Sequence, residues 1–153
     1  CGLRIGKSLM LSEAKHFGLT FHHMGLAVKE DDQAIIFLKG LGYFIGEQVY
    51  DSQQNVHLRM CIASGKPSVE LIMPASDEGP LTPILKRHNE LIYHLCYEVE
   101  DLEFSLQAIG EAGLRVLPVS KPKPAVLFNG KNVSFYNVLG FGLIELLESD
   151  CIQ

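Results

Sequence analysis

Residues 21–28 read Phe21-His22-His23-Met24-Gly25-Leu26-Ala27-Val28, and residues 92–99 read Ile92-Tyr93-His94-Leu95-Cys96-Tyr97-Glu98-Val99. Both segments alternate large apolar side chains with small or polar ones, which is the period-two pattern of a β-strand. Each has a histidine at its third position, His23 in the first segment and His94 in the second. Internal similarity of this kind is examined before single residues, because a repeat dictates the architecture. The two segments therefore predict a duplicated fold.

A glutamate recurs at corresponding places in the two copies. Glu70 lies in Ser68-Val69-Glu70-Leu71-Ile72, and Glu145 lies in Gly142-Leu143-Ile144-Glu145-Leu146-Leu147. The interval from Glu70 to Glu145 nearly equals the interval from His23 to His94. The copies therefore keep register apart from a few loop residues, and each contributes one histidine and one glutamate.

The first copy is predicted to run strand, helix, strand, strand, strand. Leu19 to Val28 alternates as a strand, Asp31-Asp32 supplies an N-cap signal, and apolar residues at helical spacing follow until Gly40 and Gly42. Turn-forming residues at 51–55 and 64–67 separate three further strands. We expect these strands at 43–50, 56–63 and 68–73.

The same order of elements recurs after a connector at 75–90, which contains a short helix near 83–88. The expected elements of the second copy are a strand at 92–99, a helix at 102–112, and strands at 114–119, 125–128, 133–137 and 142–147. Residues 1–18 show no clear periodicity and predict a peripheral arm with a short helix around 11–16.

Neither copy is large enough to bury both faces of its own sheet, so the two must pair. The predicted fold class is α+β, with two paired βαβββ modules that form a curved, half-open barrel and helices on the outside. With 153 residues, a single domain over 1–153 is expected. Module 1 spans about 19–74, the connector 75–90 and module 2 about 91–148.

Composition excludes several classes of function. The hydrophobic fraction is 47%, too high for a disordered chain, and 18 acidic against 13 basic residues give a net charge of −5. No cluster of lysine and arginine is present, so a nucleic-acid partner is not expected. No apolar run approaches the roughly 20 residues that cross a bilayer. The cysteines show no CxxC spacing, which indicates reduced thiols in a cytoplasmic protein; they are Cys1, Cys61, Cys96 and Cys151.

The duplicated residues predict a metal site. His23 shares its strand face with Gly25 and Ala27, which leave room for a ligand, whereas His22 is expected on the helix-packing face. Glu70 and Glu145 each interrupt an apolar strand, where a charge requires a partner. A lone strand histidine or glutamate is usually structural or solvated, so the duplication is what favours ligands. The predicted set binding one divalent cation is His23, Glu70, His94 and Glu145.

Three stretches of the chain resemble the vicinal oxygen chelate superfamily, over about residues 20–148. They are residues 21–28, the connector 79–87 leading into Tyr93 to Glu103, and Leu143-Ile144-Glu145-Leu146. This superfamily includes glyoxalase I, fosfomycin and bleomycin resistance proteins, extradiol dioxygenases and methylmalonyl-CoA epimerases. The connector, with its proline before a short amphipathic helix, is most similar to the epimerases.

The resemblance implies a metal-dependent isomerase that removes the proton next to a thioester carbonyl. Coordination positions left open by the four side chains would bind substrate oxygens. Epimerases of this kind carry a glutamate, proposed as the base, where this chain has Val49. Glu47 and Asp51 share the strand parity of Val49 and are therefore the candidate bases, together with Glu145 as a catalytic ligand.

Two other functions remain open in the same fold. One is a glyoxalase-like isomerase or lyase, which needs a similar set of ligands. The other is a binding protein that sequesters an antibiotic or another small molecule without chemistry. The resemblance also implies a homodimer and a small-molecule substrate such as an acyl-CoA, with Lys121, Lys123 and Lys131 as the basic residues available to its phosphates. Cobalt, manganese, nickel, zinc and iron all tolerate such a ligand shell.

Overall fold

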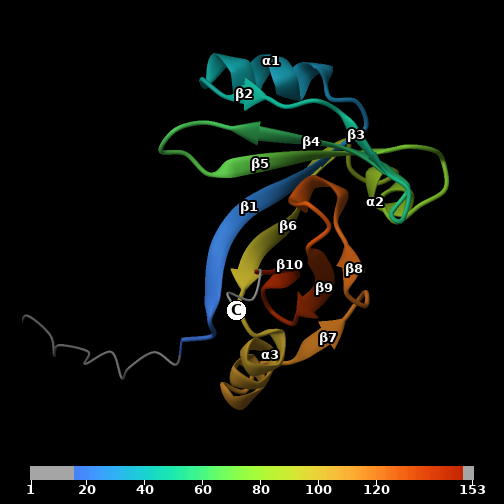
Figure 1. Cartoon of the computed structure of the whole chain (residues 1–153). Coiled ribbons are helices and arrows are strands. Elements are labelled where there is room, and N and C mark those ends of the chain that lie inside the picture. Colours follow the sequence, from blue (N-terminus) through green and yellow to red (C-terminus); the bar gives the residue numbers. More distant parts are fainter. Residues whose placement is uncertain (1–15, 150–153) are drawn as a thin grey trace, which may run out of the picture.

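One continuous ten-stranded sheet organises the chain (Figure 1). The computed structural model describes residues 16–149, in which three short α-helices accompany the sheet. The helix predicted around 11–16 falls, apart from His16, on residues outside the described range. In the part of the chain that the structure describes, no helix has the length and apolar character needed to span a bilayer.

The first half of the sheet comes from residues 19–74. Its elements are β1 (Leu19–Val28), α1 (Asp32–Gly40), β2 (Phe44–Ile45), β3 (Val49–Asp51), β4 (Val56–Ile62) and β5 (Ser68–Pro74). A connector follows that carries the one-turn helix α2 (Thr82–Leu85). The predicted order of strand, helix and strands is therefore present, with the third element divided into β2 and β3.

The second half repeats the order. Its elements are β6 (Glu90–Val99), α3 (Leu102–Glu111), β7 (Val116–Pro118), β8 (Lys123–Pro124), the 3₁₀ helix η1 (Val126–Phe128), β9 (Asn132–Val138) and β10 (Gly142–Glu148). The strands lie in the order β2-β4-β5-β1-β6-β10-β9-β7, with β3 also paired to β4 and β8 to β9. The antiparallel β1–β6 pair joins the halves, and β5 and β10 run parallel to β1 and β6.

The halves are related symmetrically across the β1–β6 pair, and the sheet curves around its inner face (Figure 1). Helices α1 and α3 cover the outer face at opposite ends. Leu38 of α1 packs with Cys61 and Leu71, while Leu102 and Leu106 of α3 pack against the other end. The α+β class with paired modules, a curved sheet and outer helices is therefore confirmed.

The two longer helices begin differently. The Asp101 carboxylate caps α3 by accepting the Phe104 N–H at 2.9 Å. Asp31 occupies the corresponding position of α1, but its side chain caps no N–H and instead accepts from Arg59 Nε at 2.9 Å. The N-cap signal therefore marked the correct helix start, although the carboxylate stabilises a contact between α1 and β4 instead.

Two predicted strands differ from the structure. Ile45 pairs with Cys61 and Val49 with Leu58, so residues 46–48 face the shorter segment 59–60 and form a bulge between β2 and β3. The strand predicted at 125–128 is wrong, because η1 occupies these residues. There the Phe128 N–H donates to the Ala125 carbonyl, and Asn129 follows with a left-handed φ of 54°.

Candidate metal centre

Four adjacent strands bring the four predicted ligands onto the inner face of the sheet. Gly25 of β1 pairs with Glu70 of β5 on one side and with His94 of β6 on the other. One row further along, Cys96 of β6 pairs with both His23 and Glu145. Residues paired across strands share a face, so two neighbouring rows carry all four side chains.

The four side chains are buried and close together. His23, Glu70, His94 and Glu145 expose between 0% and 4% of their surface, and their ligand atoms all lie within 4.8 Å of one another. Nε2 of His94 lies 2.8 Å from Oε2 of Glu145. Nε2 of His23 lies 3.7 Å from Oε2 of Glu70 and 3.9 Å from Oε2 of Glu145. The ligand atoms of the four residues therefore lie together in one buried cluster.

Burial controls the charges of this cluster. It lowers the pKa of His23 to about 3, with smaller contributions from His94 and His22, so this imidazole is neutral at neutral pH. Burial also raises the pKa of Glu70 well above its ordinary value, and the negative charges of Glu145 and Asp51 raise it further. Burial therefore keeps the His23 ring neutral and makes the ionised form of Glu70 unfavourable.

The donor atoms fit a divalent cation. Within residues 16–149, Nε2 of His23 and both ring nitrogens of His94 are buried without a hydrogen-bond partner, since the 2.8 Å contact to Glu145 lacks hydrogen-bond geometry. A buried unpaired nitrogen costs free energy, and so do two carboxylates in one dry site. A divalent cation bound to these atoms would pair with the nitrogens and offset the carboxylate charge. The cluster is therefore consistent with a divalent metal site.

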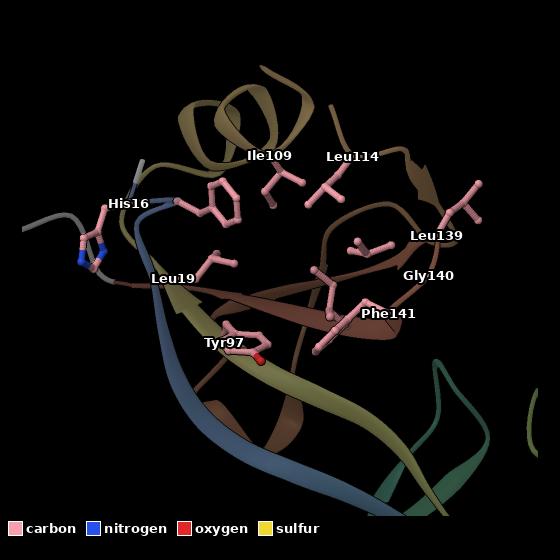
Figure 2. A pocket seen from close by; sticks show the side chains of 11 residues that line it. His16, Leu19, Tyr97, Ile109, Leu114, Leu139, Gly140 and Phe141 are labelled. Carbon is pink, nitrogen blue, oxygen red and sulfur yellow. The ribbon is translucent and has the colours of Figure 1, made fainter. Parts of the chain in front are cut away.

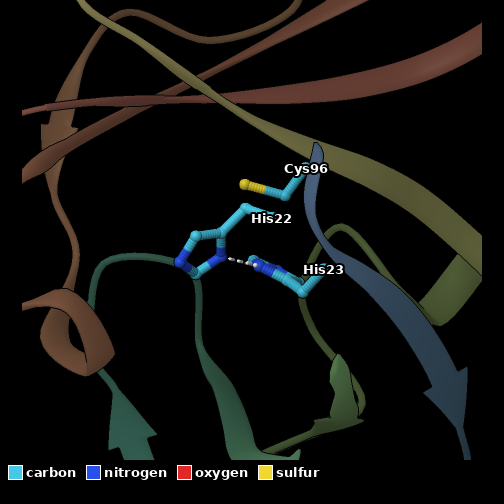
Figure 3. Close-up of side chains that lie close together, drawn as sticks. All are labelled: His22, His23 and Cys96. Carbon is cyan, nitrogen blue, oxygen red and sulfur yellow. Dashed lines mark hydrogen bonds between the residues drawn. The ribbon is translucent and has the colours of Figure 1, made fainter. Parts of the chain in front are cut away.

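Bulges in the central strands bring unexpected neighbours to the cluster. The β1–β6 register shifts once between Phe21 and His23 and once between Gly25 and Leu26. The first shift turns His22 toward His23, so that their Nδ1 atoms are 2.8 Å apart (Figure 3). The second shift adds Tyr93, next to His94, as an extra residue on β6. The prediction that His22 faces the helix side is wrong, because alternation fails at a bulge.

Two connected cavities adjoin the cluster. A cavity of about 300 Å³ is lined by Asp51, Gln53, Tyr93, Lys123 and other residues. It shares Asp51, Tyr93 and three further residues with a space of about 10 Å³ at Glu70, His94 and Glu145. The larger cavity therefore adjoins the space at the cluster along a shared wall.

The candidate bases occupy different environments. Asp51 is buried, lines both cavities, and lies in β3 opposite Val56. Its Oδ1 accepts the Gln53 and Gln54 N–H groups at 2.8 and 3.2 Å. Glu47 is exposed in the bulge and lines neither cavity. Val49 is half-buried on the same face as Asp51, two residues away.

The 3₁₀ helix η1 covers the cluster. The Phe128 ring stacks on His23 with 5.4 Å between ring centres and meets His22 edge-on at 5.3 Å. Ala125 and Leu127 complete this wall of the small space. Sequence reasoning missed this cover, since it assigned these residues to a strand. It also missed Tyr93, for which the duplication offered a signal: Tyr93 precedes His94 as His22 precedes His23.

Cys96 lies beside the imidazoles without being available as a thiolate. It is fully buried and free, and burial together with the nearby carboxylates raises its pKa. Cys61 is also free, and burial is the main cause that raises its pKa. Cys1 and Cys151 lie outside the described residues. Both described cysteines are therefore protonated thiols, in agreement with the expected reduced state.

A larger cavity, of about 650 Å³, lies on the other face of the sheet (Figure 2). Ile109 of α3 and Leu114, which follows the helix, face Tyr97, Leu139 and other residues across it. Tyr97 neighbours Cys96 along β6 and so points away from the cluster. Its lining is mainly apolar and contains no group of candidate metal ligands. Among the described residues, the groups of candidate metal ligands therefore lie on the inner face.

Comparisons with known proteins agree with this geometry. The chain is 30% identical over 129 residues to an ethylmalonyl-CoA/methylmalonyl-CoA epimerase of Cereibacter sphaeroides, covering 82% of this chain and 94% of that protein. It is 26% identical to the mitochondrial methylmalonyl-CoA epimerase of Bos taurus, covering 82% and 71% of the two chains.

Solved structures share the fold. A methylmalonyl-CoA epimerase of Mycobacterium tuberculosis superposes with a TM-score of 0.69 at 22% identity, covering 92% of this chain and 93% of that one. A Streptomyces coelicolor methylmalonyl-CoA epimerase in complex with 2-nitronate-propionyl-CoA gives 0.66 at 21% identity, covering 86% and 99%. The model of the glyoxalase/bleomycin resistance protein/dioxygenase superfamily matches residues 22–135. The chain belongs to this superfamily.

Proposed function

We propose that the protein is a metal-dependent isomerase of the methylmalonyl-CoA epimerase type, which removes and returns the proton next to a thioester carbonyl. The observation that supports this most is the buried cluster of two carboxylates and two imidazoles, whose Nε2 atoms have no hydrogen-bond partner among the described residues, beside a cavity of about 300 Å³. The sequence relatives that are named as epimerases, which the chain matches over most of its length, support the same reaction.

In this proposal His23, Glu70, His94 and Glu145 hold one divalent cation. When bound, the cation supplies positive charge that stabilises the negative charge developing on a carbonyl oxygen as the α-proton leaves. Burial keeps the His23 imidazole unprotonated at neutral pH, so its ring nitrogen is available to the cation. Two histidines and two carboxylates are compatible with cobalt, manganese, nickel, zinc or iron.

Asp51 is proposed as the base that moves the proton. It lies on the wall shared by the two cavities, and hydrogen bonds from Gln53 and Gln54 hold its carboxylate in one orientation. A fixed carboxylate within reach of the substrate is what general base catalysis requires. Glu145 lines the same small space and is proposed as the second proton-transferring group. The exposed side chain of Glu47 makes it the weaker candidate.

The cavity lining supports an acyl-CoA as the substrate. Tyr93, Val133 and Phe135 supply apolar walls that exclude water from the acyl group, while Lys123 contributes positive charge to the lining. Phosphate groups of a coenzyme are anionic, so Lys123 is proposed to contact them. Lys131 is less available to a phosphate, because its Nζ lies 3.8 Å from Oε1 of Glu98.

The two modules are proposed to act as a single domain, because each contributes one histidine and one glutamate to the cluster. Neither module contains the full set. A homodimer is proposed on the resemblance to the epimerases alone, and sedimentation velocity checks it: one species of about twice the 17.0 kDa chain mass is expected.

Deuterium exchange tests the reaction. Metal-loaded protein is incubated with methylmalonyl-CoA in deuterated water, and mass spectrometry follows incorporation at the α-carbon. We expect one deuterium per molecule, and no incorporation with His94→Ala or after chelation. A metal-loaded sample that binds the acyl-CoA and exchanges no proton would reject the epimerase.

A glyoxalase-like isomerase remains the second candidate, because it uses the same ligand shell. It predicts turnover of a glutathione hemithioacetal and no exchange on the acyl-CoA. A binding protein that sequesters small molecules needs no metal, so four converging buried ligands disfavour it.

A further inference from the structure

The two ligand histidines differ in what their second ring nitrogen meets. Each follows the extra residue of a bulge, His22 before His23 and Tyr93 before His94. Nδ1 of His23 lies 2.8 Å from Nδ1 of His22 (Figure 3). Nδ1 of His94 is buried and has no hydrogen-bond partner in the part of the chain that the structure describes. The two copies therefore contain similar β-bulges, and the bulge in β1 places a hydrogen-bond partner beside its histidine.

The protons of this pair follow from the position of the cluster. Nε2 of His23 faces the carboxylates of Glu70 and Glu145 at 3.7 and 3.9 Å. A cation held among them would take the lone pair of Nε2, and the proton of the neutral ring would then lie on Nδ1. The His23 N–H then donates to Nδ1 of His22, and His22 carries its own proton on Nε2.

The surroundings hold His22 in this position. Its ring meets Phe128 edge-on at 5.3 Å and His23 edge-on at 5.1 Å. The bulge fixes the backbone beneath it. An acceptor that is held by packing orients its partner better than one that rotates freely, because less side-chain entropy is lost.

We propose that His22 is a positioning residue, which holds His23 in the Nδ1–H tautomer and directs Nε2 at the cation. This inference rests on the metal site of the proposed function. Outer hydrogen-bond partners of metal-binding histidines generally fix the ring and raise its basicity. Since His94 has no such partner, the support at His23 carries more of the site's preorganisation.

A second metal site at His22, His23 and Cys96 is the competing interpretation, since their ligand atoms also lie within 4.8 Å of one another. Two features oppose it. The Nδ1 atoms already satisfy each other at 2.8 Å, and Cys96 is a buried thiol whose pKa the neighbouring carboxylates raise. Metal binding generally needs the thiolate.

Cobalt binding tests the role of His22. Metal-free wild type and variants are titrated with Co²⁺ by calorimetry, and the visible absorption of bound cobalt reports the ligand shell. His22→Phe keeps a ring against Phe128 and removes the acceptor, so we expect an affinity about 10–100-fold lower. His22→Asn restores an acceptor oxygen and should recover most of the affinity. His57→Phe, which removes an imidazole that contacts Tyr50, is the matched control and should bind as wild type.

The outcomes separate the two proposals. If the wild type binds no Co²⁺, both the metal site and the proposed function are rejected. Wild type that binds Co²⁺, with His22→Phe equal to it within twofold, overturns the positioning role alone. A stoichiometry of two ions that falls to one in His22→Phe supports the second metal site instead.

A measurement on the unmodified chain covers the case in which His22→Phe does not fold. Long-range ¹H–¹⁵N correlation spectra of the zinc-loaded wild type report which ring nitrogen carries each proton. We expect Nδ1–H for His23 and Nε2–H for His22. The reverse assignment for either ring contradicts the inference.

Discussion

Gly25 lies directly beside His94 in the β1–β6 pair, and no larger residue fits there. A Cβ atom at position 25 would lie 2.6 Å from Nδ1 and 2.7 Å from Nε2 of the His94 ring. Real Cβ contacts are essentially never this short. The absent side chain of Gly25 is therefore the space that the imidazole of His94 occupies.

Gly25→Ala is expected to displace His94 and to weaken divalent metal binding at least tenfold, with fold largely retained. Calorimetric titration with Co²⁺ measures the loss. Gly110→Ala is the control: a Cβ atom there meets nothing within 4 Å, and alanine in helix α3 should stabilise the protein by about 0.5–1 kcal/mol. Unchanged cobalt affinity in Gly25→Ala would show that the ring does not need this space.

Metal addition is expected to stabilise the protein in proportion to the logarithm of its concentration. A ligand at 100 times its Kd adds about 2.7 kcal/mol to the free energy of unfolding. Thermal scans of chelated protein with increasing Zn²⁺ or Co²⁺ measure the shift in Tm. His94→Ala and Glu145→Gln should lose most of it, since their atoms are among the four that converge. If the Tm of both variants rises as much as that of the wild type, the cation binds elsewhere.

Glu70→Gln is expected to stabilise the metal-free protein while weakening metal binding. Burial and the charges of Glu145 and Asp51 raise the pKa of Glu70, so its ionised form is unfavourable in the fold. A neutral amide of the same shape removes that cost, about 1 kcal/mol or more at neutral pH. Urea unfolding at pH 8 with a chelator measures it. If Glu70→Gln is less stable than the wild type under these conditions, the raised pKa of Glu70 is contradicted.

The metal-free protein is expected to lose stability through His23 as the pH falls below about 6.5. The pKa of His23 is about 3 in the folded protein, mainly through burial, against 6.5 for an ordinary histidine. Between these values the unfolded chain binds the proton and the folded chain does not, so unfolding is favoured by a few kcal/mol at most.

Glu70 acts in the opposite direction, because a raised pKa contributes stability that is lost as the pH rises. Urea unfolding from pH 7 to pH 4 in the Glu70→Gln background therefore isolates the histidine. Adding His23→Gln to this background should flatten the profile. A profile that is equally steep in the double variant assigns the effect to other groups.

Asp51→Asn is expected to lower the rate of α-proton exchange at least 100-fold while leaving cobalt binding close to wild type. Asp51 lines the cavity at the cluster and is not one of the four converging ligands. Glu47→Gln should change the exchange rate less than threefold, since Glu47 lines neither cavity. The reverse ranking of the two variants assigns the base to Glu47.

The sequence determined the duplication, the α+β class and the four converging residues. Strand alternation places His23, His94, Glu70 and Glu145 on a predictable face, because side chains along a strand repeat every two residues. The duplication also implies that the two copies pair around one axis, which brings corresponding residues together. Both are local or repeated patterns, which a single chain displays without its structure.

Tertiary structure alone decided the surroundings of the cluster. His22 points at His23 because β1 has one more residue than β6 at this bulge. No local sequence pattern shows how many residues the partner strand has there. Phe128 covers the site because residues 125–130 turn over the inner face. Asp51, and not Glu47, reaches the cavity because the bulge at 46–48 shifts register within the segment predicted as one strand. Such shifts depend on which strands pair, which is decided only when distant segments fold together.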